Sequence, residues 1–144
     1  MRVLWMLFCA LMLSHANTVP TGTIQVNITG LRSDKGQVIL LLFQQGKGFP
    51  GDPAKAVAMQ RAEMQSDRAS ATFAEIPFGT YAVSVLHDEN ANAKMDTTLI
   101  GLPKEGWGTS LNPKPRFRAP KFEESKFQFS SPSQAVEIEM LYLR

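Results

Sequence analysis

Apolar and polar residues alternate in a segment near the start of the chain. Ile24, Val26 and Ile28 are separated by single polar residues, and this period of two predicts a strand with one buried face. Residues 33–36, Ser-Asp-Lys-Gly, predict a turn. The run that follows, residues 38–43, is continuously apolar, which predicts a strand that is covered on both faces or lies in the middle of a sandwich.

Further short strands are predicted along the rest of the chain. The period of two recurs in residues 69–73, 81–87, 127–129 and 136–140. Asp52 and Pro53 predict the cap and first residue of a short helix that continues from Ala54. Residues 57–64 are compatible with either a helix or an edge strand.

This pattern predicts an all-β fold. About seven short strands with turn signals between them favour a small antiparallel β-sandwich, and they leave a barrel open as the alternative. From Asp88 to Pro120 the alternation gives way to Gly, Pro and Asn, which predicts one long irregular loop. A loop of this length in a small domain is usually functional or disordered.

The first sixteen residues have the anatomy of a secretory signal peptide. Arg2 precedes an apolar run at residues 3–13, and Ser14 and Ala16 place small residues three before and one before the predicted cleavage point. Eleven apolar residues are too few to span a hydrocarbon core of ~30 Å as a helix. We therefore expect residues 1–16 to be removed and residues 17–144 to form one exported domain, periplasmic or secreted, with an uncleaved membrane anchor as the alternative.

Composition narrows the function of that domain. Hydrophobic residues make up 44% of the chain and charged residues 19%, as in ordinary globular domains. Cleavage would remove Cys9 and His15, which leaves no thiol for a disulfide, a zinc cluster or a nucleophile, and leaves His87 as the single histidine. The formal charge of +2 falls to +1 when Arg2 is removed, so the overall charge gives no sign of a nucleic-acid or membrane partner.

One stretch of the sequence resembles a known family. The segment from Phe73 to Asn90, followed by Lys94-Met95-Asp96 and by residues 101–110, resembles the bacterial domain-of-unknown-function family 2141 (DUF2141). The resemblance implies an exported or periplasmic protein and a sandwich similar to transthyretin-like and carboxypeptidase-regulatory-like domains, and it implies no established activity. Where that family commonly has Asn-Gly in the polar loop, this chain has Asn92-Ala93.

The polar loop carries a candidate calcium site. Its oxygen-bearing positions follow the pattern Asp-x-Asn-x-Asn-x-Lys-x-Asp, which calcium loops use: Asp88, Asn90, Asn92, the backbone carbonyl of Lys94, and Asp96. Two positions depart from the pattern, since Ala93 stands in place of the turn glycine and Leu99 in place of a bidentate glutamate.

A calcium ion would therefore need a further carboxylate, for which Glu89, Glu105 and Glu75 are the candidates. The alternative is that the Asx side chains bond to their own backbone and build a wide turn without metal. Both interpretations stay open on the sequence.

Four residues are candidates for a ligand or partner surface: His87, Trp107, Arg116 and Arg118. Trp107 lies between two glycines, where it either caps the core or serves as a contact. Both arginines belong to a Pro-rich basic segment at residues 113–121, which predicts a solvated extended loop or attraction to an anionic component of the cell envelope.

Three functions follow as hypotheses. The first is a non-enzymatic binding or accessory domain, ordered by Ca²⁺ through the Asp88–Asp96 loop, whose partner is an envelope protein, a peptide or a glycan. The second is a structural accessory of an envelope assembly without metal. The third is a hydrolase centred on His87 with Ser84 or Ser110, although the sequence has no Gly-x-Ser-x-Gly elbow.

Overall fold

The computed structural model describes residues 17–143, so the predicted signal peptide lies outside the described residues. The elements in chain order are β1 (Thr21–Thr29), β2 (Gln37–Phe43), the 3-10 helix η1 (Pro53–Lys55), β3 (Ala58–Gln65), β4 (Arg68–Pro77), β5 (Gly79–Asp88), β6 (Gly106–Thr109), α1 (Phe122–Ser125), β7 (Phe127–Phe129) and β8 (Ser133–Glu139). Within this part of the chain, no helix is long and apolar enough to cross a membrane.

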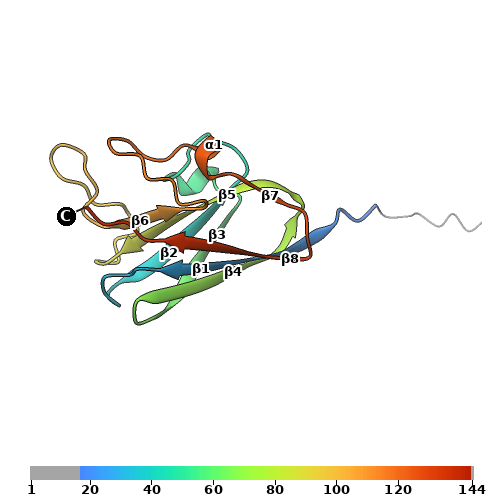
Figure 1. The fold of residues 1–144 in the computed structure, drawn as a ribbon, viewed down its shortest axis with the longest axis horizontal. Coiled ribbons are helices and arrows are strands. Elements are labelled where there is room, and N and C mark those ends of the chain that lie inside the picture. The colour runs from blue at the N-terminus through green and yellow to red at the C-terminus, as the bar shows by residue number, and fades with distance from the viewer. Residues whose placement is uncertain (1–16, 144) are drawn as a thin grey trace, which may run out of the picture.

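The strands form one sheet that nearly closes on itself (Figure 1). Its order is β6-β5-β2-β3-β4-β1-β8, and β7 adds to the start of β5. The strand pairs are antiparallel except for β1 and β8, which run parallel. The two ends of the order meet where Trp107 and Leu141 exchange backbone hydrogen bonds of 3.0 and 2.8 Å.

The all-β prediction is confirmed, and the antiparallel sandwich is not. Strand β3 changes partner along its length, since residues 58–62 pair with β2 and residues 63–65 pair with β4. This change joins the two halves of the sheet, so the architecture is closer to a barrel than to two separate sheets. The segment at 57–64, for which the sequence allowed a helix or an edge strand, is therefore a strand that pairs with both β2 and β4.

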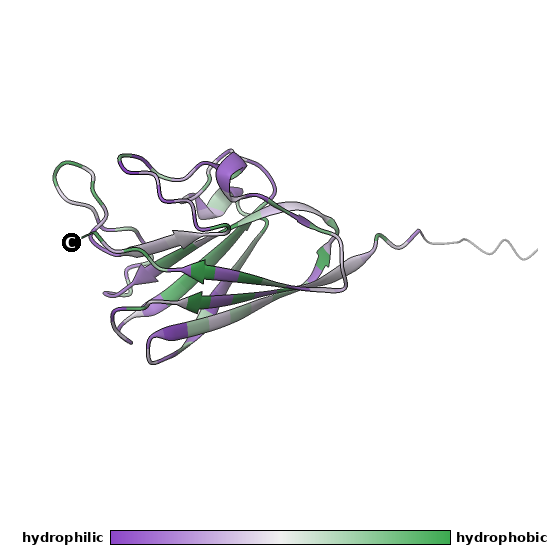
Figure 2. Cartoon of the chain, viewed as in Figure 1, coloured by the Kyte–Doolittle hydropathy of each residue, from purple (hydrophilic) through white to green (hydrophobic). Residues whose placement is uncertain are grey.

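The interior is filled by the alternating positions of the strands. Ile24, Val26 and Ile28 of β1 are buried together with Val83 and Ile138, and Figure 2 shows hydrophobic and hydrophilic residues alternating along β1 and β8. The period of two in the sequence therefore marks the true inward face.

Strand β2 is buried on both faces, as its continuous apolar run predicts. Leu40 faces the interior, while Ile39, Leu41 and Phe43 lie in a second cluster on the outer side. Phe122 of α1 closes that cluster, together with Phe49 from the loop that contains η1. The predicted short helix is confirmed as η1, in which the carboxylate of Asp52 accepts a hydrogen bond from the Ala54 N–H at 3.0 Å.

Two long loops project from one end of the sheet, which we call the loop end (Figure 1). Strands β5 and β8 finish there, and β2 and β6 begin there. The predicted single loop from Asp88 to Pro120 is wrong in this respect, because β6 divides it into residues 89–105 and residues 110–121. Residues 17–20 enter β1 at the opposite end.

Candidate functional site

Asp88, the last residue of β5, anchors the first loop. Its side chain is fully buried. One carboxylate oxygen accepts from the Asn92 N–H at 3.1 Å, and the other accepts from the Ala93 N–H at 2.7 Å and from the Gln37 amide at 2.7 Å. The carboxylate therefore holds the loop in a tight turn in which Ala93 has a positive φ of 61°, the conformation that glycine adopts more readily.

Glu105 holds the other side of the same loop. It is 5% exposed, and its two oxygens accept from the Glu89 N–H at 3.0 Å and the Asp96 N–H at 3.1 Å. A carboxylate that takes two backbone N–H groups satisfies donors that the loop would otherwise leave unpaired near the protein interior. Glu105, one of the carboxylates predicted to complete a calcium site, therefore accepts hydrogen bonds from backbone N–H groups of the loop.

The three remaining side chains of the predicted calcium pattern do meet. The amide nitrogens of Asn90 and Asn92 donate to the Asp96 carboxylate, at 2.5 Å from Asn90 and at 3.0 and 3.2 Å from Asn92. The amide oxygens of Asn90 and Asn92 accept from backbone N–H groups of Asn92 and Lys94, at 3.2 and 2.9 Å. This is the Asx-turn arrangement.

As arranged, the loop does not fit a calcium ion. Calcium takes six to eight oxygens, whereas Asp96 is faced by two amide N–H₂ groups and both Asp88 oxygens are turned to backbone N–H donors. No cluster of three or more His, Cys, Asp or Glu suited to a metal occurs among residues 17–143. The third candidate carboxylate is misplaced, because Glu75 lies near the end of β4, beside the start of β1 and away from the loop end.

The sequence pattern predicts calcium binding, whereas the hydrogen bonds of the loop predict none, and melting experiments decide between the two. We expect the same melting temperature in excess chelator and in millimolar CaCl₂, because protein N–H groups already occupy the loop carboxylates. A rise of several degrees with calcium in the wild type, absent in an Asp96→Asn variant, would contradict this expectation and show that the amide groups rotate to offer their oxygens.

Glu89, the other candidate carboxylate, points away from the loop interior. It pairs with the Arg32 guanidinium and accepts from the Ser33 hydroxyl at 2.7 Å. The hydrogen bonds from Arg32, with smaller help from Ser33, lower the pKa of Glu89 from 4.5 to about 2. Arg32 also donates to the Lys104 carbonyl at 3.1 Å, so this ion pair ties residues 32–33 to the end of the first loop.

The Glu89 pair predicts a pH-dependent contribution to stability. A carboxyl group whose folded pKa lies below its unfolded value stabilises the fold above the unfolded pKa, and the contribution is lost as pH falls through the folded pKa. Since Arg32 is 44% exposed, solvent screening limits the effect to about 1 kcal/mol. We expect Glu89→Gln to be less stable than wild type by that amount at pH 7, and the two urea-unfolding curves to converge as pH falls from 4.5 toward 2.

Exposed Glu63, which has no ion pair among the described residues, supplies the control variant Glu63→Gln. A gap between Glu89→Gln and wild type that is the same at every pH would contradict the assigned cause.

His87 is not on a surface, which corrects its place among the candidate contact residues. The ring is fully buried, because β5 directs its side chain into the sheet next to the C-terminal segment. Nδ1 lies 2.7 Å from the Tyr142 hydroxyl and Nε2 lies 2.9 Å from the Lys35 carbonyl. A carbonyl only accepts, so Nε2 carries a proton and donates it to the Lys35 carbonyl.

Neither serine of the hydrolase hypothesis contacts this ring in the structure. The Ser84 hydroxyl donates to the Pro50 carbonyl at 2.6 Å, and the Ser110 hydroxyl donates to the Ser125 carbonyl at 2.6 Å. The described residues therefore hold His87 and the two serines in separate structural hydrogen bonds.

Trp107, Arg116 and Arg118 have different surroundings. Trp107 is half-buried in β6 and bridges Leu141 through its backbone. Arg118 forms two hydrogen bonds with Glu124, of 2.8 and 2.6 Å, which fasten the second loop to α1. Arg116 is exposed and makes no ion pair within residues 17–143, so it is the member of this set that is free for a partner.

Three exposed apolar residues at the ends of the two loops were not predicted from the sequence. Residues 97–103 form a small hairpin in which the Thr98 N–H donates to the Leu102 carbonyl at 2.8 Å. At its tip, Leu99 is 108% exposed and Ile100 is 81% exposed, and Phe117 on the second loop is 95% exposed. The available signal was the apolar pair Leu99-Ile100 within an otherwise polar loop.

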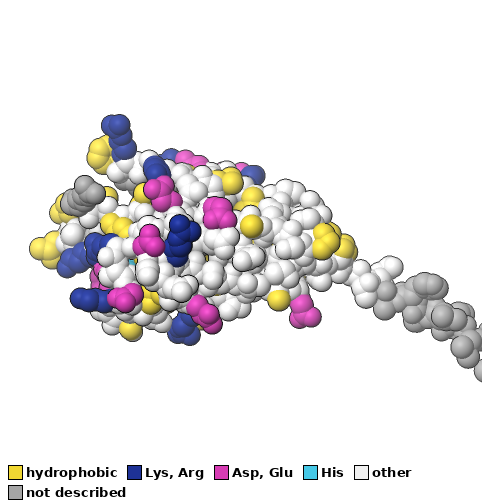
Figure 3. Space-filling view, turned by 60° about the horizontal axis from the view of Figure 1, so that its bottom comes forward, with side chains coloured by type: hydrophobic (Ala, Val, Ile, Leu, Met, Phe, Trp, Pro, Cys, Tyr) yellow, Lys and Arg dark blue, Asp and Glu magenta, His cyan; other side chains and the backbone are white. Residues whose placement is uncertain are grey.

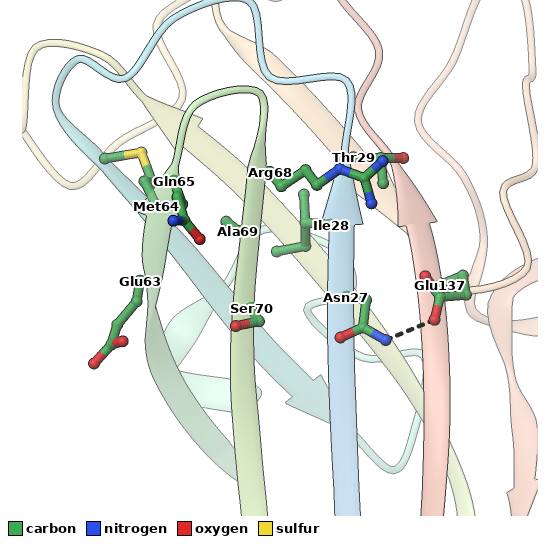
Figure 4. A pocket seen from close by; sticks show the side chains of 10 residues that line it. All are labelled: Asn27, Ile28, Thr29, Glu63, Met64, Gln65, Arg68, Ala69, Ser70 and Glu137. Carbon is green, nitrogen blue, oxygen red and sulfur yellow. Dashed lines mark hydrogen bonds between the residues drawn. The ribbon is translucent and has the colours of Figure 1, made fainter.

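A hollow over β1, β3 and β4 has no group of polar side chains that point toward a common centre. It is lined by the ends of β3 and β4 and by β1 (Figure 4). Among the ten side chains drawn, the one hydrogen bond joins the Asn27 amide to Glu137 at 2.6 Å. Glu63 and Arg68 point away from each other, so the charged side chains of the hollow do not face a common ligand position.

Comparison with known proteins finds one family. Residues 26–137 match the family model described as "Uncharacterized protein conserved in bacteria (DUF2141)", which is the family that the sequence resembles. No curated protein and no solved structure matches the chain.

Proposed function

Since the chain belongs to the bacterial DUF2141 family, we propose that it is an exported, non-enzymatic binding domain whose loop end holds a component of the cell envelope. Export is supported by the signal anatomy of residues 1–16. The observation that carries the binding role is the exposure of Leu99, Ile100 and Phe117 on two loops at one end of the sheet.

Exposed apolar tips are costly in water unless they meet a partner. Single exposed apolar residues are common, but large ones gathered at one end of a small domain are typical of interaction sites. Figure 3 shows hydrophobic side chains protruding at this end next to Lys and Arg side chains. A surface of this kind favours binding over catalysis, because it offers no enclosed site for a substrate.

The loops that carry the tips are held firmly at their base. Glu105 takes the N–H groups of Glu89 and Asp96. On the second loop, Asn112 donates to the Glu137 carbonyl at 3.1 Å and accepts from the Glu139 N–H at 2.8 Å. A surface that is ordered before it binds loses less conformational entropy on binding, which supports a dedicated recognition role.

Retention on an envelope fraction tests this function. We expect wild-type protein to stay with the fraction, and a Leu99→Ser/Ile100→Ser/Phe117→Ser variant to be washed off, because it lacks the apolar contacts. The matched control is Val57→Ser/Met59→Ser, which removes exposed apolar side chains beside the end of β2, away from the loops. Equal retention of both variants would refute the proposed binding surface.

A further inference from the structure

We infer that the partner of the loop end is an anionic lipid surface, into which the loop tips insert while the neighbouring cations meet the phosphate headgroups. This assignment rests on the proposed function, because it names the partner of the same surface. It is drawn from the charge, the shape and the ion pairing of the two loops.

Positive charge is concentrated in the segment that carries the two loops. Residues 90–118 contain five Lys or Arg and two Asp or Glu, a net charge of +3, so the remainder of the chain, whose total is +2, carries −1. The cations are adjacent to the tips in the chain, since Phe117 lies between Arg116 and Arg118 and Lys104 follows Leu102 closely. The near-neutral overall charge conceals this separation.

Ion pairing divides the cations of the two loops into those that have a carboxylate partner and those that do not. Glu89 is paired with Arg32, and Glu139 is paired with Lys114 at 2.8 Å. Asp96 and Glu105 accept N–H groups of the first loop. Among residues 17–143, no ion pair is formed by Lys94, Lys104 or Arg116, which leaves them to bind phosphate groups.

The shape of the apolar surface favours a lipid over a folded partner. Leu99 and Ile100 lie at the tip of the 97–103 hairpin, Phe117 lies in the second loop, and all three side chains are exposed. Figure 3 shows hydrophobic side chains protruding at this end. Protruding side chains can enter a partner that deforms around them without a matching pocket, as the boundary between headgroups and acyl chains does. Cations placed beside such side chains add attraction to an anionic leaflet.

Vesicle co-sedimentation tests the inference with the purified protein. The probes are vesicles of phosphatidylcholine alone and vesicles of equal parts phosphatidylcholine and phosphatidylglycerol. We expect binding to the anionic vesicles, weak binding to the neutral ones, and a loss of binding as salt is raised. Arg116→Gln and Lys104→Gln should each weaken binding about 5-fold, which corresponds to about 1 kcal/mol per cation near the surface.

A substitution that is expected to leave vesicle binding unchanged serves as control. Lys55→Gln removes an exposed lysine of η1, between the end of β2 and the start of β3, and should leave vesicle binding unchanged. Insertion has its own signal, because a tryptophan introduced by Phe117→Trp should shift its emission to the blue with anionic vesicles, and one introduced by Met59→Trp should not.

Three results would overturn the inference. Equal binding to both vesicle compositions, or equal weakening by Lys55→Gln and Arg116→Gln, would remove the anionic lipid as partner. No vesicle binding together with tip-dependent retention on the envelope fraction, abolished by protease treatment of that fraction, would also remove it and would leave a protein as the partner in the proposed function.

Discussion

Asp88→Ala is expected to lower the free energy of unfolding by about 3 kcal/mol, because it removes the buried acceptor of three part-buried hydrogen bonds, at about 1 kcal/mol each. The donors of these bonds are the Asn92 and Ala93 N–H groups and the Gln37 amide. For a domain of this size, such a loss lowers the melting temperature on the order of 10 °C. Thermal unfolding followed by circular dichroism measures it.

The same substitution should release the first loop before the sheet unfolds. Native-state hydrogen exchange should lose its protection at the N–H groups of Asn92 and Ala93 while β2 and β5 keep theirs. Asp34→Ala is the control, since Asp34 is exposed in the turn at 33–36 and is expected to change stability by no more than about 0.5 kcal/mol. Equal effects of the two variants would contradict the anchoring role of Asp88.

Gly36→Ala is expected to destabilise the protein by at least about 2 kcal/mol, as overpacking against backbone atoms and a left-handed residue both do. Gly36 has φ of 70°, and a Cβ atom there would lie 2.0 Å from the Asp88 carbonyl oxygen and 2.6 Å from the Glu89 Cα. Backbone atoms cannot give way as a side chain would, so the turn at 33–36 must move off the start of the first loop. Urea unfolding measures the loss.

A second glycine provides the matched comparison for Gly36. A Cβ atom at Gly51 would meet nothing within 4 Å, so Gly51→Ala should be neutral or slightly stabilising, through the reduced entropy of the unfolded chain. Should Gly36→Ala also prove neutral, the close packing of the turn against Asp88 would be disproved.

Local patterns predicted most of the strands but not β6, while the long-range pairings needed the structure. Alternation in β1 and the apolar run of β2 fix which residues face inward, because side chains of a strand alternate between two faces. Nothing local shows that β1 pairs in parallel with β8, or that β3 changes partner after residue 62. Both depend on segments far apart in the chain, and together they decide between a sandwich and a nearly closed sheet.

The candidate site likewise combines features that local sequence predicts with contacts that it does not. The Asx pattern located the polar loop, but the acceptors of that loop are used by backbone N–H groups, which a list of side chains does not reveal. The burial of His87 depends on Tyr142, which lies 55 positions away along the chain, so no local pattern predicts the contact. Arg116, Arg118 and Trp107 were predicted as contact residues from their type and their neighbours in the sequence, and their different surroundings follow from partners such as Glu124 and Leu141.

The two termini of the described chain lie at different distances from the loop end. Asn17 lies at the far end of the sheet from the loops, whereas Tyr142 is packed against His87 at the loop end (Figure 1). Immobilisation on a sensor chip through the amino terminus would therefore present Leu99, Ile100 and Phe117 outward. A bulky carboxy-terminal fusion would sit beside them and mask the binding it was meant to report.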